Sequence, residues 1–172
     1  MRKTLMFLAL AGLVSSLAFA TGLSATPGNK YANTTDTRNC DSGDVEYSGP
    51  LKLWPPNHKF VDANVTATAD DPGAAVTLNL TPALTDVAGG DGGPNHDPDF
   101  VMDPPDGMDS GTGSASVDID LRAERSGKGV GRTYTIDWVA SFGGDTCSSM
   151  DADQEPFVVT VPHDMRGGAD WK

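Results

Sequence analysis

The sequence predicts an all-β protein, an antiparallel β-sandwich of about seven short strands, on three observations. Apolar residues recur at every second position in several segments, which is the period of a strand with one buried face. No segment after residue 20 repeats its apolar residues with the helical period of 3.6 over three turns. Glycine and proline are frequent, at 20 and 12 of 172 residues, as expected of a chain with many turns. A small closed barrel is the alternative architecture.

The period-two pattern locates the strands. In the clearest segment Val117, Ile119 and Leu121 alternate with charged residues, which predicts one dry and one solvated face. The predicted strands cover residues 60–69, 76–80, 117–123, 134–140 and 157–161. Residues 124–131 hold three alternate glycines, and this predicts a hairpin turn that pairs the two flanking strands antiparallel.

The first residues have the three parts of a secretory signal peptide. Arg2 and Lys3 precede an apolar run, and Ala18-Phe19-Ala20 provides the small-x-small cleavage site. The apolar run is interrupted before it reaches the roughly 20 residues that a transmembrane anchor needs. We therefore expect cleavage before Thr21, a secreted protein, and no membrane insertion after cleavage.

Composition divides the chain into four parts. Residues 1–20 form the expected signal peptide, and residues 21–39, rich in small polar residues, are an expected flexible N-terminal lead. Residues 40–165 form the expected folded domain, and residues 166–172 a C-terminal tail. One domain fits the length of the chain.

Acidic residues outnumber basic ones two to one. There are 24 Asp and Glu against 12 Lys and Arg, which gives a net charge of -12 at pH 7 and an isoelectric point near 4.3. Such a chain repels phosphate backbones and anionic lipid headgroups. Composition therefore argues against nucleic acids and membrane surfaces as partners, and leaves cations and uncharged ligands.

Cys40 and Cys147 are the only cysteines, and both follow the signal segment. In an oxidising compartment one disulfide between them is the expected arrangement, because only one intramolecular pairing is available. The bridge would close a loop of about 100 residues, for which chain entropy gives up to about 4.7 kcal/mol of stabilisation. Two free thiols or an intermolecular bond are the alternatives.

Three strings give the chain a resemblance to a known family. They are residues 53–59 (LWPPNHK), residues 121–127 (LRAERSG) with 131–136 (GRTYTI), and residues 159–164 (VTVPHD). In order and spacing they resemble the immunoglobulin-like repeats of secreted and surface-attached bacterial proteins, which are related in fold to fibronectin type III and HYR modules.

The resemblance covers about residues 45–165 and implies an immunoglobulin-like sandwich that serves as a non-catalytic extracellular module, without a defined ligand. Two features depart from the family pattern. Residues 143–153 are expected to form a longer loop with one cysteine where the family has a short turn, and the module is expected to stand alone rather than in a long multidomain chain.

The segment Asp86–Asp109 is the most conspicuous candidate site. It holds seven aspartates and no Lys or Arg, and its glycines and prolines predict neither strand nor helix. Carboxylates on a turning backbone suit Ca²⁺, so calcium is the candidate cofactor. The first candidate ligands are Asp97, Asp99 and Asp103, with Asp91 and Asp106 as reserves. No known calcium motif fits, and a solvated acidic loop without a metal is the alternative.

Other side chains suggest weaker hypotheses. Three histidines, His58, His96 and His163, lie among carboxylates, but their spacing matches no zinc motif. Trp138 is in phase with the core-facing residues of its predicted strand, whereas Trp54 and Trp171 are the tryptophans left for a sugar platform. No nucleophile elbow of the G-x-S-x-G type occurs.

The sequence therefore predicts a secreted, non-enzymatic module of the adhesion or matrix type, stabilised by calcium if the acidic segment binds it. Its expected partner is an extracellular protein or glycan surface. The alternative is a small secreted glycan-binding protein or hydrolase that uses the segment 86–109 together with His96.

Overall fold

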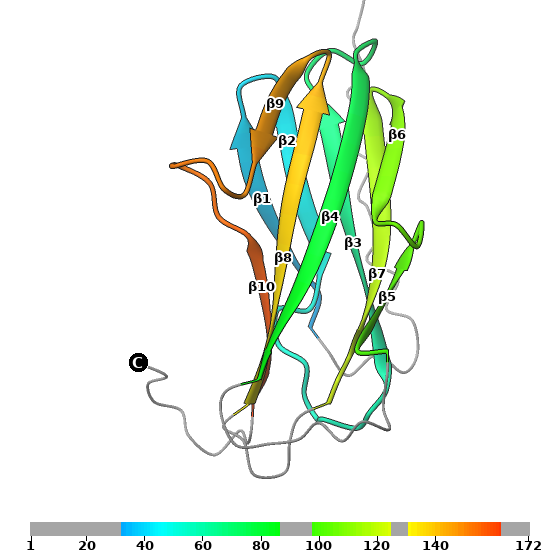
Figure 1. The fold of residues 1–172 in the computed structure, drawn as a ribbon, viewed down its shortest axis with the longest axis vertical. Coiled ribbons are helices and arrows are strands. Elements are labelled where there is room, and N and C mark those ends of the chain that lie inside the picture. The colour runs from blue at the N-terminus through cyan, green and yellow to red at the C-terminus, as the bar shows by residue number, and fades with distance from the viewer. Residues whose placement is uncertain (1–31, 87–97, 125–130, 163–172) are drawn as a thin grey trace, which may run out of the picture.

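The computed structural model describes residues 32–86, 98–124 and 131–162. All regular structure in these residues is β-strand, arranged as two antiparallel sheets that pack face to face (Figure 1). The predicted all-β antiparallel sandwich is therefore confirmed. The described residues form ten strands in place of the expected seven or so.

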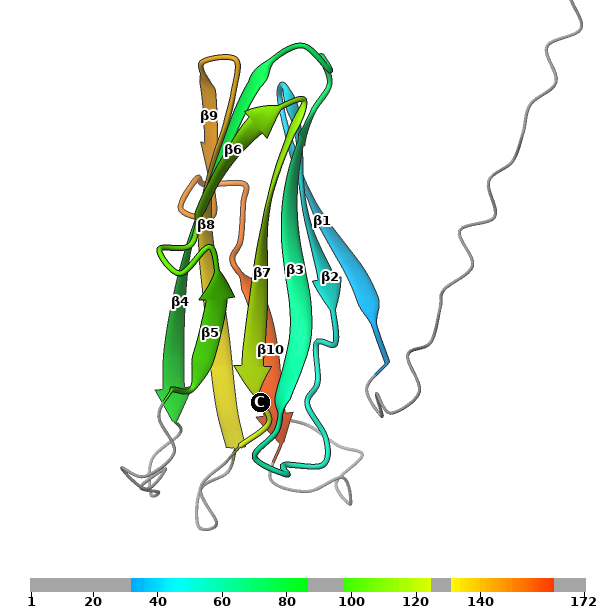
Figure 2. The same ribbon diagram turned by 90° about the vertical axis from the view of Figure 1, so that its right-hand side faces the viewer.

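The first sheet, sheet A, has the strand order β1-β2-β3-β7-β5. Its strands are β1 (Thr34–Cys40), β2 (Gly43–Gly49), β3 (Phe60–Ala69), β7 (Ser114–Arg122) and β5 (Phe100–Asp103). Figure 2 shows β7 and β3 side by side in this sheet, with β1 and β2 beyond them.

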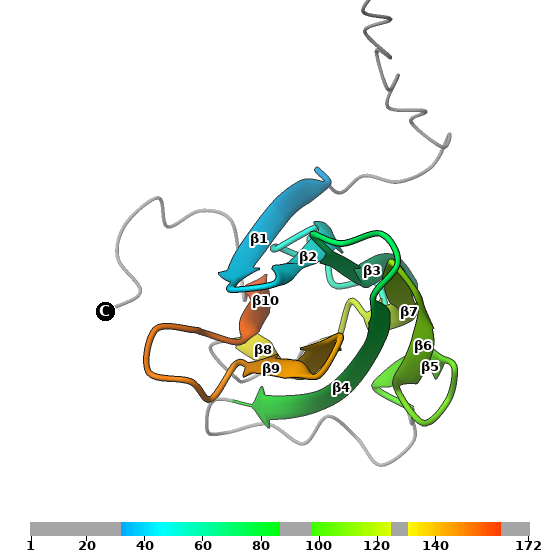
Figure 3. The same cartoon turned by 90° about the horizontal axis from the view of Figure 1, so that it is seen from above.

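The second sheet, sheet B, has the order β10-β8-β4-β6, and β9 pairs with β8 as well. Its strands are β10 (Phe157–Pro162), β8 (Gly131–Phe142), β4 (Ala75–Asp86), β6 (Met108–Thr112) and β9 (Asp145–Ser148). Viewed down the long axis, β1, β2 and β3 lie across the core from β4, β8 and β9 (Figure 3).

Alternate residues of the long strands fill the core between the sheets. Ile119 of β7 and Ile136 of β8 are fully buried, as are most of the apolar residues that flank them at every second position. Trp138, predicted as a core residue, is buried, and its ring packs 6.3 Å from that of Phe157, which in turn lies 5.6 Å from Tyr47. Each side chain of this size contributes about 1.5–3 kcal/mol through burial.

Strands with an apolar alternation were found where the sequence predicts them. The strand predicted over residues 60–69 matches β3. The segments predicted over 76–80 and 134–140 extend further at both ends, because backbone pairing between β4 and β8 continues past their apolar residues.

The N-terminal lead is shorter than expected. Residues 21–39 were predicted to be flexible, but β1 begins at Thr34 and pairs with β2 from Thr34↔Gly49 to Cys40↔Gly43. Its residues are polar, so no hydrophobic period marks the strand. Backbone hydrogen bonds to β2 hold it as an edge strand instead. The signal peptide and the rest of the lead, residues 1–31, are outside the described residues.

The predicted hairpin between residues 117–123 and 134–140 is wrong. β7 belongs to sheet A, where it pairs with β3 and β5, whereas β8 belongs to sheet B and pairs with β4, β9 and β10. The two strands lie in opposite sheets and share no ladder. The apolar period of a strand identifies its buried face but not its neighbour, and so it is equally consistent with both arrangements.

The acidic segment Asp86–Asp109 was predicted to hold no strand, and this is also wrong. β5 pairs with β7, and β6 pairs with β4. Both strands are short and lie at sheet edges, where polar side chains and adjacent prolines are tolerated because one side of the backbone is free of ladder bonds.

The predicted disulfide is confirmed. Cys40 and Cys147 are bridged, with their Cα atoms 6.0 Å apart, and they lie 107 positions apart in the sequence. The bond joins β1, at the edge of sheet A, to β9 in sheet B. It therefore ties the two layers together along one side of the sandwich.

Candidate functional site

The outer face of sheet A is acidic. Strand alternation turns the partners of buried residues outward, and the carboxylates that it exposes are Asp44, Glu46, Asp62, Asp103, Asp118 and Asp120, here called the acidic face. In the strand register Asp62 lies directly opposite Asp120, and Asp103 directly opposite Asp118. Like charges in directly opposite positions destabilise a sheet.

This arrangement of like charges changes the pKa of Asp120. Partial burial, a hydrogen bond with the Asp62 side chain, and the negative charges of Asp62 and Asp118 together raise the pKa of Asp120 above its ordinary value of 3.8. Asn64 relieves part of the crowding, since its Nδ2 donates to Asp118 Oδ1 at 2.7 Å. The acidic face thus holds a proton more readily than an isolated carboxylate would.

The outer face of sheet B has the opposite character. Its outward side chains stand in rows of directly opposite residues that cross the sheet, and we call them the neutral face. The rows are Ser110, Thr77, Ser141 and Thr146; Met108, Asn79, Val139 and Ser148; Thr81 and Asp137; Ala83, Thr135 and Val158; Thr85, Thr133 and Thr160. Asp137 is the only charged residue among them.

The exposed aliphatic side chains of the neutral face stand among hydroxyl groups. Val139 of β8 is 46% exposed, Val158 of β10 is 44% exposed, and Met108 of β6 is 52% exposed. The Oδ1 atom of Asp137 accepts a hydrogen bond of 2.9 Å from the buried Ser149, so this carboxylate already has a partner. The face is therefore rigid, weakly apolar and almost free of charge.

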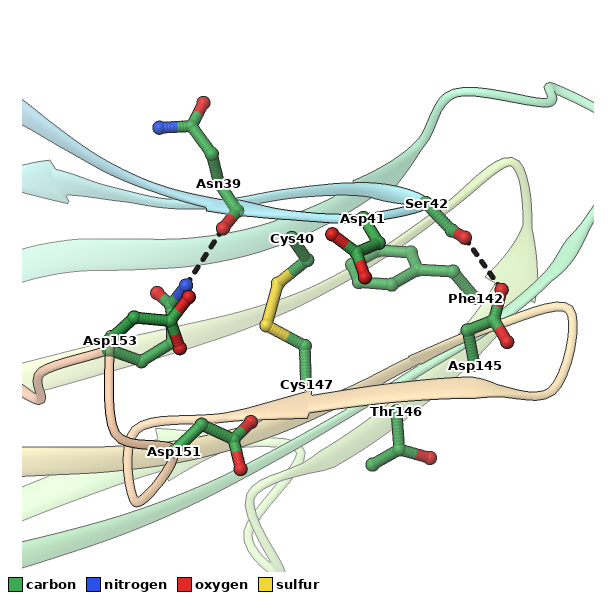
Figure 4. Close-up of a pocket in the computed structure, with 11 residues that line it drawn as sticks. Asn39, Cys40, Asp41, Ser42, Phe142, Asp145, Thr146, Cys147, Asp151 and Asp153 are labelled. Atoms are coloured by element: carbon green, nitrogen blue, oxygen red, sulfur yellow. Dashed lines mark hydrogen bonds between the residues drawn. A yellow bond between two sulfur atoms is a disulfide. The ribbon is translucent and has the colours of Figure 1, made fainter.

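A shallow hollow of about 340 Å³ lies at the disulfide end of the sandwich. Figure 4 shows Asp41, Asp145, Asp151 and Asp153 around the bond between Cys40 and Cys147. Asp145 accepts a hydrogen bond of 2.7 Å from Ser42 Oγ, and Asp151 accepts one of 2.7 Å from the Ser148 amide. Asp145 thus links its turn to the turn between β1 and β2, Asp151 stabilises its own turn, and the hollow is open and polar.

At the opposite end, polar side chains are buried where β7 and β8 approach each other. Arg132 is 3% exposed, and its guanidinium donates to Asp99 Oδ1 at 2.6 Å. The Tyr134 hydroxyl donates to the Arg122 carbonyl oxygen at 2.7 Å, and burial raises the pKa of this hydroxyl. These contacts fix the end of the sandwich and serve the fold.

Glu124 is the other buried charge at this end. One of its carboxylate oxygens lies 3.4 Å from His58 Nδ1, and the other lies 3.8 Å from Arg122 Nε without a hydrogen bond. His58 has a positive φ of 61°, a conformation that its amide supports by donating to the Ala123 carbonyl oxygen at 3.0 Å. Glu124 and His58 thus link the segment before β3 to the end of β7.

The predicted calcium ligands are not brought together as a set by the described residues. Asp99 is engaged by Arg132, while Asp103 joins the acidic face. Asp106 accepts a hydrogen bond of 3.2 Å from the Met108 amide, which is a turn contact. Asp91 and Asp97 lie outside the described residues. Within residues 32–86, 98–124 and 131–162, no group of three or more His, Cys, Asp or Glu side chains is arranged to hold a metal ion.

The remaining candidate side chains have mixed outcomes. His58 lies beside Glu124, whereas His96 and His163 are outside the described residues, so the zinc hypothesis is not tested. Trp54 is half-buried, and Trp171 is outside the described residues. Of the two tryptophans considered for a sugar platform, only Trp54 therefore lies in the described part of the chain.

The neutral face was missed by sequence analysis. Its signal is present in the chain, because Thr, Ser and Asn occupy the outward positions of β4 and β8 where β7 has aspartates. Yet the sequence does not say which strands share a sheet, and a face appears only when their outward positions are placed in register.

The comparisons with known proteins do not identify the chain. No family model matches it, and no curated protein is similar enough to count as a relative. In the described part of the chain no helix is long and apolar enough to cross a membrane.

Proposed function

We propose that the protein is a secreted, non-enzymatic interaction module of the adhesion or matrix type, and that it contacts its partner through the neutral face. The observation that carries the proposal is that Asp137 is the single charge among the described outward side chains of the strands of sheet B, in a protein with a net charge of -12. The other sheet bears six outward carboxylates. Cores of protein interfaces are depleted in charge, so the neutral face is the surface best suited to contact.

The scaffold supports this role. The disulfide between β1 and β9 holds the two sheets together, and outward side chains of sheet B project from long paired strands rather than from loops. A site on rigid elements loses little conformational entropy on binding. The signal-like first 20 residues and the disulfide agree with action outside the cytoplasm.

Export is tested by producing the full chain in a bacterial host. We expect the exported protein to have an intact mass that begins at Thr21 and that takes up no alkylating agent in the absence of reductant. A protein retained in the cytoplasm with residues 1–20 attached would contradict secretion.

Contact through the neutral face is tested with a matched pair of variants. Val139→Asp puts a charge on the neutral face, and Val101→Asp puts the same charge on sheet A at a valine of similar exposure, 44% against 46%. The probes are the immobilised chain itself and two uncharged polysaccharides, cellulose and dextran. We expect at least one probe to retain the protein, Val139→Asp to abolish retention, and Val101→Asp to leave it. Retention of none of them, or equal loss in both variants, contradicts the proposal.

A further inference from the structure

We infer that the partner of the neutral face is a second copy of this chain, bound face to face about a two-fold axis. This inference rests on the proposed function, since it names the occupant of the same surface. It is carried by the distribution of charge, by the size of the face and by the chemistry of its side chains.

Charge decides which surfaces of two copies can meet. The full chain has a net charge of -12, and most approaches of two exported copies bring carboxylates together. Contact between two acidic faces would set the carboxylates of Asp62, Asp103, Asp118 and Asp120 in one copy against the carboxylates of the other. Contact between two neutral faces brings in only Asp137, whose carboxylate is held by Ser149.

Salt screens the remaining repulsion between the carboxylates of the two copies. Packed sheets lie about 10 Å apart, and the Debye length at physiological ionic strength is about 8 Å. The carboxylates of the acidic face lie on the far side of the sandwich from such a contact, and they are therefore largely screened. Self-association through the neutral face should consequently strengthen as salt is added, whereas binding of a basic partner would weaken.

The face is large enough for a dimer. Along β4 the outward residues run from Thr77 to Thr85, which at about 3.4 Å per residue spans about 27 Å. Across the sheet, β6, β4, β8 and β9 lie about 4.8 Å apart. With its side chains the face projects over roughly 600 Å², so two copies would bury roughly 1,200 Å² in total, the lower end of the range of standard interfaces.

The chemistry of the face is self-complementary. A threonine or serine hydroxyl both donates and accepts hydrogen bonds, so rows of them can pair with identical rows, as a two-fold interface requires. Val139 and Val158 supply the apolar surface that such rows lack. The neutral face contains no aromatic residue, since Trp138 points into the core, and it therefore offers no stacking platform for a sugar ring.

The first experiment is sedimentation equilibrium of the exported chain from about 1 μM to 1 mM. We expect a monomer–dimer equilibrium whose dissociation constant falls at least about fivefold between 20 and 300 mM NaCl, because screening removes like-charge repulsion. A monomer at every concentration overturns the inference. So does a dimer that dissociates as salt is added.

The second experiment introduces single charges on the neutral face and on sheet A. Val139→Asp and Val158→Asp should each weaken the dimer at least about tenfold, while the matched control Val101→Asp leaves the dissociation constant within about twofold. Val139 lies on β8, one row from the middle of the face, so mixing Val139→Asp with Val139→Lys should restore association between the two variants. Thermal melts of all variants serve as the control for folding. No rescue in the mixture, or loss of the dimer in the control, counts against the inference.

These outcomes separate the inference from the proposed function. A monomeric protein that cellulose or dextran retains, and that loses retention in Val139→Asp alone, overturns the dimer and keeps the neutral face as the contact surface. A dimer that Val101→Asp disrupts and Val139→Asp does not would overturn both proposals, because association would then use sheet A.

Discussion

Asp62 and Asp120 face each other across β3 and β7, an arrangement that lowers stability at neutral pH. Replacing Asp120 by asparagine keeps its size and removes one of the two charges. We expect Asp120→Asn to raise the free energy of unfolding at pH 7 by about 0.5–1 kcal/mol. Thermal melts at low salt measure the change, which corresponds to a rise in Tm of a few degrees.

The same variant has a defined pH dependence. The raised pKa of Asp120 means that the folded protein keeps this proton to higher pH than the unfolded chain, so the stability of the wild type falls as pH rises above 3.8 through the raised value. The gain in Asp120→Asn should therefore be large at pH 7 and vanish near pH 3.8 or below. Asp44→Asn, which faces Thr68 across the register, is the control and should change little. An equal gain in both variants, or a gain independent of pH, would contradict the explanation.

Arg132 and Asp99 form a largely buried, hydrogen-bonded ion pair. Removing one partner leaves the other charge in a poorly solvated position. Asp99 is 27% exposed, so we expect Arg132→Met to lower the free energy of unfolding by about 2–3 kcal/mol, below the cost at a fully buried pair. Urea denaturation of Arg132→Met, Asp99→Asn and the double variant gives the coupling. Strict additivity would show that the pair contributes nothing.

At the scale of secondary-structure elements, the largest predicted effect on stability comes from the disulfide between β1 and β9. Reduction should lower the free energy of unfolding by about 3 kcal/mol and Tm by about 10 °C, because the bond closes a loop of 107 positions in the unfolded chain. Differential scanning calorimetry with and without reductant measures the shift. The double variant Cys40→Ala/Cys147→Ala should melt like the reduced protein and ignore reductant. A wild type whose Tm is indifferent to reductant rules this role out.

The strands that the sequence predicts are those in which core residues alternate. β3, β7, β8 and β10 carry apolar residues at nearly every second position, since both their neighbours and the opposite sheet exclude water from one face. β1, β5 and β6 are edge strands held mainly by backbone pairing, which is nearly independent of side-chain type. No hydrophobic period could have located them.

The pairing order of the strands could not be predicted from the sequence, for a related reason. The glycines of residues 124–131 permit a reversal of the chain, but they do not determine whether the next strand returns in the same sheet or in the opposite one. β7 and β8 each bury one face against the same core, so either arrangement satisfies their patterns. The choice depends on contacts with β3 and β4, which lie far away in sequence.

For the whole molecule, the calcium hypothesis yields a clear expectation. If Asp97, Asp99 and Asp103 bind Ca²⁺, millimolar CaCl2 should raise Tm beyond the rise in NaCl of equal ionic strength. NaCl alone should raise Tm slightly by screening a net charge of -12. Identical melting curves in the two salts would remove calcium from the description of this protein.

For the candidate site too, the sequence contains the residues but does not show which of them lie together. The composition shows the excess of carboxylates, and the sequence predicts a candidate site in the acidic segment because its aspartates are close in sequence. Asp103 instead meets Asp118 through strand pairing, 15 positions away in the chain. The neutral face is assembled from four strands and a fifth short one, and its defining property is a lack of charge that only register reveals.

The bond between Cys40 and Cys147 also determines how the molecule responds to a pulling force. A load applied to the chain on either side of the bridge passes through the two sulfur atoms, and the residues between them, with β2 to β8 among them, are excluded from extension. Only β1 and β10 can peel away, while the sandwich inside the covalent loop bears no tension. A module under load would thus keep the part of its neutral face on β4, β6 and β8 folded until a reductant opens the loop.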